Sequence, residues 1–186
     1  MIKTNSILCP WYLGKLPEHN LIKDSLMDDI NSSKVSEYRM KYKTISKTDW
    51  VEQGENRKYV NILQPFLTSY LEKLTLEMGS GNMNVYVIWF QQYGNGSAHD
   101  WHTHLQCQWT SVYYVDMPEG SPKTELIDPF TKKIIVVDAE EGDIITFPSF
   151  IIHRAPVIND NIVKTIISFN SCVDFTYDKE KHNFQY

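Results

Sequence analysis

Three histidines in the second half of the chain have the residue type and spacing of a metal site. His102 and His104 flank Thr103, and His153 lies in a later, otherwise apolar stretch. If residues 97–106 form a strand, then Asp100, His102 and His104 share one face, because side chains alternate along a strand. Neighbours on one face lie about 6–7 Å apart at their Cα atoms, so two imidazoles can reach one ion at about 2.1 Å. The pattern predicts a metal site that His153 completes.

Each part of this pattern also has a simpler interpretation. A histidine alone among aliphatic residues, as His153 is, is often only a hydrogen-bonded core residue. Asp100 is a candidate to orient an imidazole through its carboxylate, and the alternative is a solvated aspartate at the end of a strand. The conjunction of the His-x-His pair, the later histidine and a β-sandwich pattern favours the metal site.

The elements that must position these residues change character near residue 80. Before it, residues 17–30 and 58–78 carry apolar side chains at helical spacing. After it, short runs typical of β-strands are separated by Gly, Pro, Asn and Asp turns, at 83–93, 97–106, 109–116, 124–126, 133–137, 143–147, 151–157 and 162–172. We expect a single α+β, mainly β domain over residues 1–186, with a mostly helical layer (1–80) packed on one sheet of a β core (81–175).

Composition narrows the class of protein. A chain of 186 residues that is 42% hydrophobic can bury a real core. Its 18 basic and 23 acidic residues give a net charge of −5, which argues against a nucleic-acid binder. No apolar run approaches the roughly 18 residues of a membrane span, and no signal core opens the chain. Three widely spaced cysteines suit a reducing compartment. We expect a cytoplasmic protein, from a bacterium or a phage-infected host, that binds neither nucleic acid nor membrane.

Taken in order, several pieces of the second half resemble a known superfamily. They are His102-Thr103-His104, Ser111–Val115, Asp128-Pro129, Gly142–Ser149, His153 and Lys164–Asn170. Together they resemble the double-stranded β-helix (jelly-roll, cupin-like) domain of Fe(II)- and 2-oxoglutarate-dependent oxygenases, in particular the small prolyl-4-hydroxylase-like group of bacteria and phages. The resemblance covers residues 89–170 and implies that fold for the β core. It also implies Fe(II) and 2-oxoglutarate as cofactors, with ascorbate as a candidate reductant.

The resemblance assigns roles to the charged and histidine residues. It makes His102 and His153 metal ligands and puts His104 where the family normally has Asp or Glu. Three neutral imidazoles would leave the metal more positive than the usual two-histidine, one-carboxylate set, and imidazole suits several first-row metals. Lys164 stands where the family holds the far carboxylate of 2-oxoglutarate with an arginine. A buried ammonium there needs an anion, whereas a lysine on an edge strand that faces water does not.

Further residues complete the expected site. Tyr114 matches a family tyrosine that binds the same carboxylate, and Tyr113 would then face the opposite side, although parity alone does not choose between them. Gln91, on the strand before the histidine pair, is expected to line the pocket and contact the cosubstrate. Arg154 follows His153 and is expected to bind substrate or an acidic neighbour. Trp101 is expected near the mouth of the site, as a substrate wall or in packing.

Functions of three classes remain open. The leading hypothesis is an oxygenase that uses Fe(II) and 2-oxoglutarate to hydroxylate a C–H bond of a protein or peptide side chain, such as proline, or of a small molecule. The second is a cupin-type three-histidine metalloenzyme that does not use 2-oxoglutarate, which the departures at His104 and Lys164 keep open. The third is a non-catalytic binding module. A homodimer is compatible with each of them.

Overall fold

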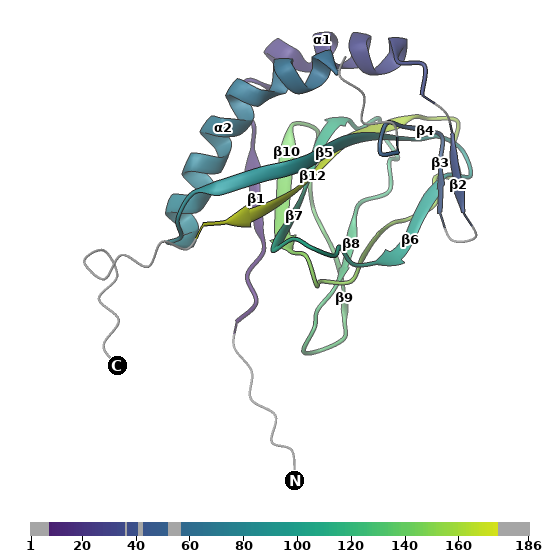
Figure 1. Cartoon of the computed structure of the whole chain (residues 1–186). Coiled ribbons are helices and arrows are strands. Elements are labelled where there is room, and N and C mark those ends of the chain that lie inside the picture. Colours follow the sequence, from purple (N-terminus) through teal and green to yellow (C-terminus); the bar gives the residue numbers. More distant parts are fainter. Residues whose placement is uncertain (1–7, 36, 41–42, 52–56, 175–186) are drawn as a thin grey trace, which may run out of the picture.

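The computed structural model describes residues 8–35, 37–40, 43–51 and 57–174, and these form two six-stranded antiparallel sheets (Figure 1). Sheet A has the strand order β1 (Tyr12–Lys15), β10 (Asp143–Pro148), β7 (Trp109–Asp116), β12 (Lys164–Val173), β5 (Met83–Tyr93) and β4 (Lys47–Thr48). Sheet B has the order β2 (Tyr38–Met40), β3 (Lys43–Ile45), β6 (Ala98–His102), β11 (His153–Ala155), β8 (Glu125–Ile127) and β9 (Ile134–Val136). From β5 to β12 the chain passes repeatedly from one sheet to the other, which makes a jelly roll. The expected double-stranded β-helix is confirmed.

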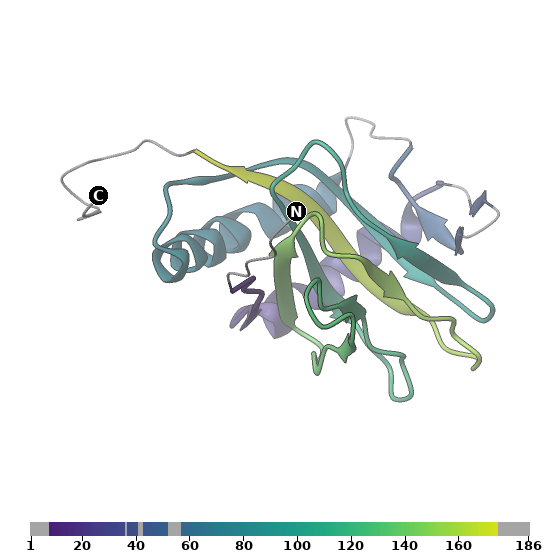
Figure 2. The ribbon, with the colours of Figure 1, turned by 90° about the horizontal axis from the view of Figure 1, so that it is seen from below.

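Two helices cover the outer face of sheet A, as Figures 1 and 2 show. They are α1 (His19–Ser32) and α2 (Lys58–Met78). The buried side chains of α2 recur every three or four residues, as at Leu63, Leu67 and Leu74, and form one apolar stripe. This stripe packs in one core with Phe90 and Phe169 of the sheet, and each buried leucine contributes about 1.5–3 kcal/mol. The predicted helical layer on one sheet is therefore confirmed. No helix in the described ranges is both long and apolar enough to cross a membrane.

A second core fills the space between the two sheets. Tyr114, Phe147 and Ile166 of sheet A meet Leu126 of sheet B in it. Because side chains alternate along β7, Tyr113 joins the core on the helix side and Tyr114 lies between the sheets. The question that parity left open is thus answered: Tyr114 belongs to the interior that also contains the histidines.

Residues before 80 contribute more β-structure than the helical pattern predicts. β1 joins the edge of sheet A beside β10, β4 joins β5, and the hairpin of β2 and β3 extends sheet B beside β6. These strands have two to four residues each, which is too short for an alternating pattern to show in the sequence. The predicted domain limits extend into residues outside the described ranges and stay a prediction.

Candidate metal centre

The structure brings His102, His104 and His153 together between the sheets. β6 and β11 are antiparallel neighbours, and His102 lies directly opposite His153 in their register. The potential ligand atoms of the three histidines all lie within 4.8 Å of one another. The ring centroid of His153 is 4.1 Å from that of His102 and 5.1 Å from that of His104. Three nitrogens at this spacing can coordinate one ion.

Backbone carbonyls fix the ring orientation of two of these histidines. Nδ1 of His102 lies 2.7 Å from the carbonyl oxygen of Asp100, and Nδ1 of His153 lies 2.9 Å from that of Ile151. A carbonyl oxygen only accepts hydrogen bonds, so Nδ1 carries the proton in each ring and Nε2 keeps its lone pair. A ring N–H that donates to a backbone carbonyl is typical of metal-binding histidines.

Burial keeps His153 in the form that a metal requires. Its side chain lies in the interior, with the residue only 5% exposed. Burial lowers the pKa of His153 well below its ordinary value, the proximity of His102 and His104 lowers it further, and the Ile151 carbonyl opposes these effects only in part. The ring is therefore neutral at neutral pH and needs to lose no proton before it coordinates.

His104 reaches the centre from a loop, although the sequence predicts a strand through residue 106. β6 ends at His102. The backbone N–H of His104 donates to the carbonyl of Ser149 at 3.0 Å, which ties this loop to the end of β10. The His104 ring also stacks on the indole of Trp89, with centroids 5.8 Å apart and planes at 22°. The hydrogen bond to Ser149 and the stacking on Trp89 thus fix the position of His104, which strand pairing does not.

A fourth histidine, His99, contacts the centre and was not among the predicted site residues. Its ring stacks on that of His102 with centroids 3.5 Å apart and an interplanar angle of 11°. Strict alternation would put His99 and His102 on opposite faces. The register shifts between them, because Ala155 pairs with His99 while His153 pairs with His102. The stretch of β6 from His99 to His102 is thus one residue longer than the stretch of β11 that it pairs with. This bulge turns His99 toward His102. No local sequence signal marks it.

Of the two interpretations of the Asp100 carboxylate, the structure fits the solvated aspartate at the end of a strand. That carboxylate is exposed and accepts a hydrogen bond from the backbone N–H of Trp101 at 2.7 Å. The group that orients His102 is the backbone carbonyl of Asp100. Asp100 therefore supports the site with its main chain, because the bulge interrupts the alternation that would have put its side chain beside His102.

Arg154 and Trp101 lie together, and Arg154 is bound to an acidic neighbour. Its Nε donates to Oε2 of Glu125 on β8 at 2.6 Å. Its guanidinium carbon lies 4.5 Å from the centroid of the Trp101 ring, at cation–π distance. Arg154 and Trp101 nevertheless remain partly exposed beside the histidines, and Arg154 contributes to the wall of the histidine pocket.

Gln91 lines a narrow pocket that the histidines share. The space free for small molecules measures about 30 Å³, enough for one water molecule or an ion. Gln91 is buried, and its Oε1 accepts a hydrogen bond from Ser168 Oγ at 3.1 Å. Thr124 lines the same pocket. A cosubstrate must therefore displace side chains of this wall to coordinate beside the ion.

Lys164 is buried between the sheets, which excludes a lysine that faces water. The residue is 2% exposed, and its Nζ donates to the carbonyl of Pro122 at 2.7 Å. Burial lowers the pKa of Lys164 to about 8. Among the ion pairs of the described residues, none involves Lys164. A buried ammonium whose acceptor is only a carbonyl is a fitting partner for an anionic ligand.

Tyr114 connects Lys164 with the histidine pocket. The Lys164 Nζ lies 5.5 Å from the centroid of the Tyr114 ring. The Tyr114 hydroxyl donates to Thr124 Oγ1 at 2.7 Å, and Thr124 lines the pocket. The interior thus presents neutral nitrogen donors and, on the same side of sheet A, a cation with neighbouring hydroxyls. This donor set fits a divalent metal and a small dicarboxylate.

Fold and site together define a double-stranded β-helix whose three clustered histidines could hold a metal ion, and solved structures of similar fold include 2-oxoglutarate- and Fe(II)-dependent oxygenases. A prolyl hydroxylase from Trichoplax adhaerens, in complex with a peptide fragment of the hypoxia inducible factor oxygen degradation domain, has a TM-score of 0.66 at 12% identity and covers 94% of this chain and 87% of its own. A Pseudomonas putida prolyl-4-hydroxylase has a TM-score of 0.58 at 11% identity over 87% of this chain and 92% of its own.

The viral collagen prolyl hydroxylase of Paramecium Bursaria Chlorella virus-1, in its 2-oxoglutarate complex, has a TM-score of 0.58 at 14% identity over 87% of this chain and 94% of its own. No family model matches the sequence, and no curated protein matches it either. The chain therefore has the fold of the 2-oxoglutarate- and Fe(II)-dependent oxygenases, prolyl-4-hydroxylases included. At these identities, the residues of the site must carry any functional argument.

Proposed function

We propose that this protein is an Fe(II)- and 2-oxoglutarate-dependent oxygenase that hydroxylates a C–H bond of a protein or peptide side chain, such as proline. One observation carries the proposal: Lys164 is a buried cation without an ion-pair partner among the described residues, in the same interior as the three histidines. A metal centre alone requires no such lysine. A cosubstrate with a ketoacid at one end and a carboxylate at the other requires both groups.

Each side chain has a definite task in this proposal. His102, His104 and His153 hold the iron through one ring nitrogen each, and the carbonyls of Asp100 and Ile151 fix the orientation of two of the rings. When both are bound, iron and 2-oxoglutarate supply an oxidant from dioxygen, with succinate and CO2 as products.

The polar interior binds and orients the cosubstrate. Lys164 exchanges its hydrogen bond to the Pro122 carbonyl for one to the far carboxylate of 2-oxoglutarate. Tyr114 turns its hydroxyl away from Thr124 and donates to the same carboxylate. Gln91 faces the body of the cosubstrate from β5. The surrounding apolar core excludes water, which strengthens the pairing between Lys164 and the carboxylate.

A peptide substrate is supported by the surroundings of the pocket. Trp101 and Arg154 offer an aromatic face and a cation beside the histidines, and both are accessible enough to contact a chain lying across the mouth. Prolyl hydroxylases are among the proteins of similar fold, and one of them is in complex with a peptide fragment. These features favour a peptide over a free metabolite.

A second candidate function is a three-histidine dioxygenase that does not use 2-oxoglutarate. The neutral donor set favours it, since His104 stands in place of the carboxylate and no acidic side chain belongs to the cluster found among the described residues. This alternative gives Lys164 no role in ligand binding. Variants of Lys164 therefore distinguish the two candidate functions.

The test measures 2-oxoglutarate binding to the iron-loaded protein under anaerobic conditions as a function of pH. Because burial holds the pKa of Lys164 near 8, the free lysine loses its charge above that pH. The affinity for 2-oxoglutarate should then fall by up to about tenfold per pH unit. Lys164→Arg should bind with no such fall, because a guanidinium stays charged. Lys164→Met should bind only weakly at every pH.

Turnover provides the second measurement, with His102→Ala as the control that lacks a ligand. Succinate formation that needs iron and is lost in both His102→Ala and Lys164→Met supports the oxygenase. Stoichiometric metal with 2-oxoglutarate affinity unaffected at Lys164 supports the second candidate. Absence of stoichiometric metal in the native chain would leave the binding module as the remaining interpretation.

A further inference from the structure

A row of aromatic rings leads away from the metal centre toward the surface. The Trp89 indole stacks on His104 with centroids 5.8 Å apart at 22°, and Trp50 stacks on Trp89 with centroids 6.1 Å apart at 29°. Tyr38 meets Trp50 edge-on, with centroids 5.7 Å apart. His104 in turn lies 5.1 Å from His153. Contacts from a candidate metal ligand outward to Tyr38 are therefore continuous.

The row passes from the interior to solvent. Trp89 is 4% exposed and Trp50 is 39% exposed. The rings come from three separate parts of the chain, on β5, after β4 and on β2. Packing alone does not require oxidisable rings in this order, since leucine or phenylalanine would fill the same volume. Indole and phenol are the side chains that give up one electron most readily after the thiols.

We propose that Trp89, Trp50 and Tyr38 form a one-electron relay between the metal centre and the surface. The inference rests on the proposed iron site and goes beyond the hydroxylation reaction. Electron transfer becomes exponentially slower with distance, so a chain of short steps between stacked rings is much faster than a single long one. The relay removes oxidising equivalents when dioxygen has reacted at the iron and no substrate C–H bond is in place.

The electrons and protons of the relay balance. One electron passes from the Trp89 indole to the oxidised iron, Trp50 returns an electron to Trp89, and Tyr38 returns one to Trp50. The phenolic proton of Tyr38 goes to water. A small one-electron reductant of the ascorbate class then gives the tyrosyl an electron, and water returns the proton. The net result is one electron moved from the reductant to the iron, with no bond made or broken in the protein.

The indole N–H of Trp89 favours passage of the charge. Its Nε1 is buried and has no acceptor among the described residues. An oxidised indole becomes a strong acid, and loss of its proton would trap the radical as a weaker oxidant. Without an acceptor, oxidised Trp89 keeps its proton and remains able to take an electron from Trp50. The missing hydrogen bond destabilises the folded state, but in the relay it keeps the proton on the oxidised indole.

The molecule contains its own matched controls. Trp11 is 37% exposed, nearly the same as Trp50, and it has no place in the row. Trp101 directly precedes His102 in the chain, and its ring packs against Arg154, which lines the histidine pocket. Oxidation governed by exposure would affect Trp11 and Trp50 alike, and oxidation governed by nearness to the metal would include Trp101. The relay predicts neither pattern.

The experiment loads the protein with Fe(II), adds hydrogen peroxide without substrate or 2-oxoglutarate, and maps oxygen-addition products on each tryptophan and tyrosine by peptide mass spectrometry. Peroxide takes two electrons from the iron and, with two protons, leaves as water. Products should concentrate on Trp50 and Tyr38, with Trp11 and Trp101 near background. Zn(II)-loaded protein should show no such pattern. Ascorbate in the reaction should suppress the products.

Two variants decide between transfer through the rings and attack by a diffusing species. In Trp89→Phe, oxidation of Trp50 should fall to the level of Trp11, because a phenyl ring is too hard to oxidise. In Trp50→Phe, products should accumulate on Trp89. Co(II) binding, measured on both variants, reports that the centre is intact. Unchanged oxidation of Trp50 in Trp89→Phe overturns the relay but leaves the iron site standing, whereas a native protein that binds no iron overturns both.

Discussion

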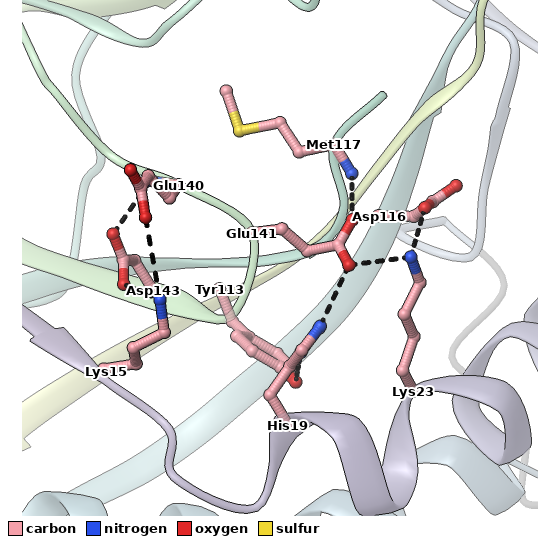
Figure 3. Close-up of polar contacts among 9 residues, drawn as sticks. All are labelled: Lys15, His19, Lys23, Tyr113, Asp116, Met117, Glu140, Glu141 and Asp143. Carbon is pink, nitrogen blue, oxygen red and sulfur yellow. Dashed lines mark hydrogen bonds and ion pairs between the residues drawn. The ribbon is translucent and has the colours of Figure 1, made fainter. Parts of the chain in front are cut away.

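His19 and His153 are buried to the same extent, each 5% exposed, yet their surroundings differ completely. His19, on α1, has a partner for both ring nitrogens: Nδ1 lies 2.7 Å from the Tyr113 hydroxyl and Nε2 lies 3.2 Å from a Glu141 carboxylate oxygen (Figure 3). Glu141 also accepts hydrogen bonds from Lys23 and from the backbone N–H of Met117. His153 has one carbonyl partner, and a potential ligand atom of its ring lies within 4.8 Å of those of two more imidazoles.

The difference separates a histidine whose partners belong to the fold from one that we propose to hold a metal ion. Around His19 each polar group meets a partner of opposite character, and the network joins α1 to the turn before β10 and the end of β7. At the histidine cluster, three side chains of one kind instead bring their potential ligand atoms within 4.8 Å of one another, an arrangement that an added cation would stabilise. Burial alone does not distinguish the two sites, whereas the groups that contact each imidazole do.

The largest effect should come from removing one ligand. His153→Ala should lower metal affinity by at least about 100-fold, because even residues that only orient a metal ligand are worth about 10–100-fold. His19→Ala should leave metal affinity unchanged. Titration of both variants with Co(II) measures this contrast, and loss of binding in both would mean that the two histidines do not have separate tasks.

The next largest effect is on the free energy of unfolding, and here His19→Ala should have the larger effect and His153→Ala the smaller one. His19→Ala removes a well-packed ring and leaves the buried Tyr113 hydroxyl without its partner, so it should lower the free energy of unfolding by about 3 kcal/mol. His153→Ala should lower it less, because it also removes a ring that is crowded by His102 and His104. Urea denaturation of the metal-free proteins gives both values. A more stable His19→Ala would contradict the structural role.

Lys164 extends the comparison to a buried cation that we propose to bind a carboxylate of the cosubstrate. Burial lowers the pKa of Lys164 to about 8, so the charged form destabilises the ligand-free fold at neutral pH. Lys164→Met should therefore raise the free energy of unfolding by about 2 kcal/mol, although it weakens 2-oxoglutarate binding. Thermal denaturation without ligand measures the gain. A loss of stability would indicate that the hydrogen bond to Pro122 is the reason for the lysine.

The smallest expected effect is the acid sensitivity of the His19 network. Partial burial alone would raise the pKa of Glu141, but hydrogen bonds from Lys23, Met117 and His19 outweigh it and lower the pKa to about 2. The pKa is thus lower in the folded than in the unfolded chain, so the stabilisation is complete above about pH 4.5 and is lost as the pH falls toward 2. Since Glu141 is partly exposed, we expect about 1 kcal/mol. Glu141→Gln should flatten this part of the stability–pH curve.

Much of the β core could be predicted from the sequence, because its long strands are buried in a regular pattern. The limits expected for β5 and β7 match those of the structure, as do the limits of α2. The short strands of residues 12–48 could not be predicted, since two to four residues show no period and their pairing depends on distant partners.

The site was predictable in its residue types and less so in its geometry. His102 and His153 could be paired because each sits on a strand next to recognisable neighbours. The bulge in β6, which brings His99 to His102 and turns the Asp100 carboxylate outward, depends on the register with β11 and has no local signal. For the same reason the burial of Lys164 follows from the position of β12 inside sheet A and could not be read from its neighbours in sequence.

The most direct test of the central claim is the X-ray absorption spectrum of the Zn(II)-loaded protein, which counts imidazole ligands. The structure predicts three imidazole nitrogens at about 2.0–2.1 Å, reduced to two in His104→Ala and unchanged in His19→Ala. A spectrum of the native protein with fewer than three imidazoles, or with the same number in His104→Ala, would contradict a three-histidine metal centre.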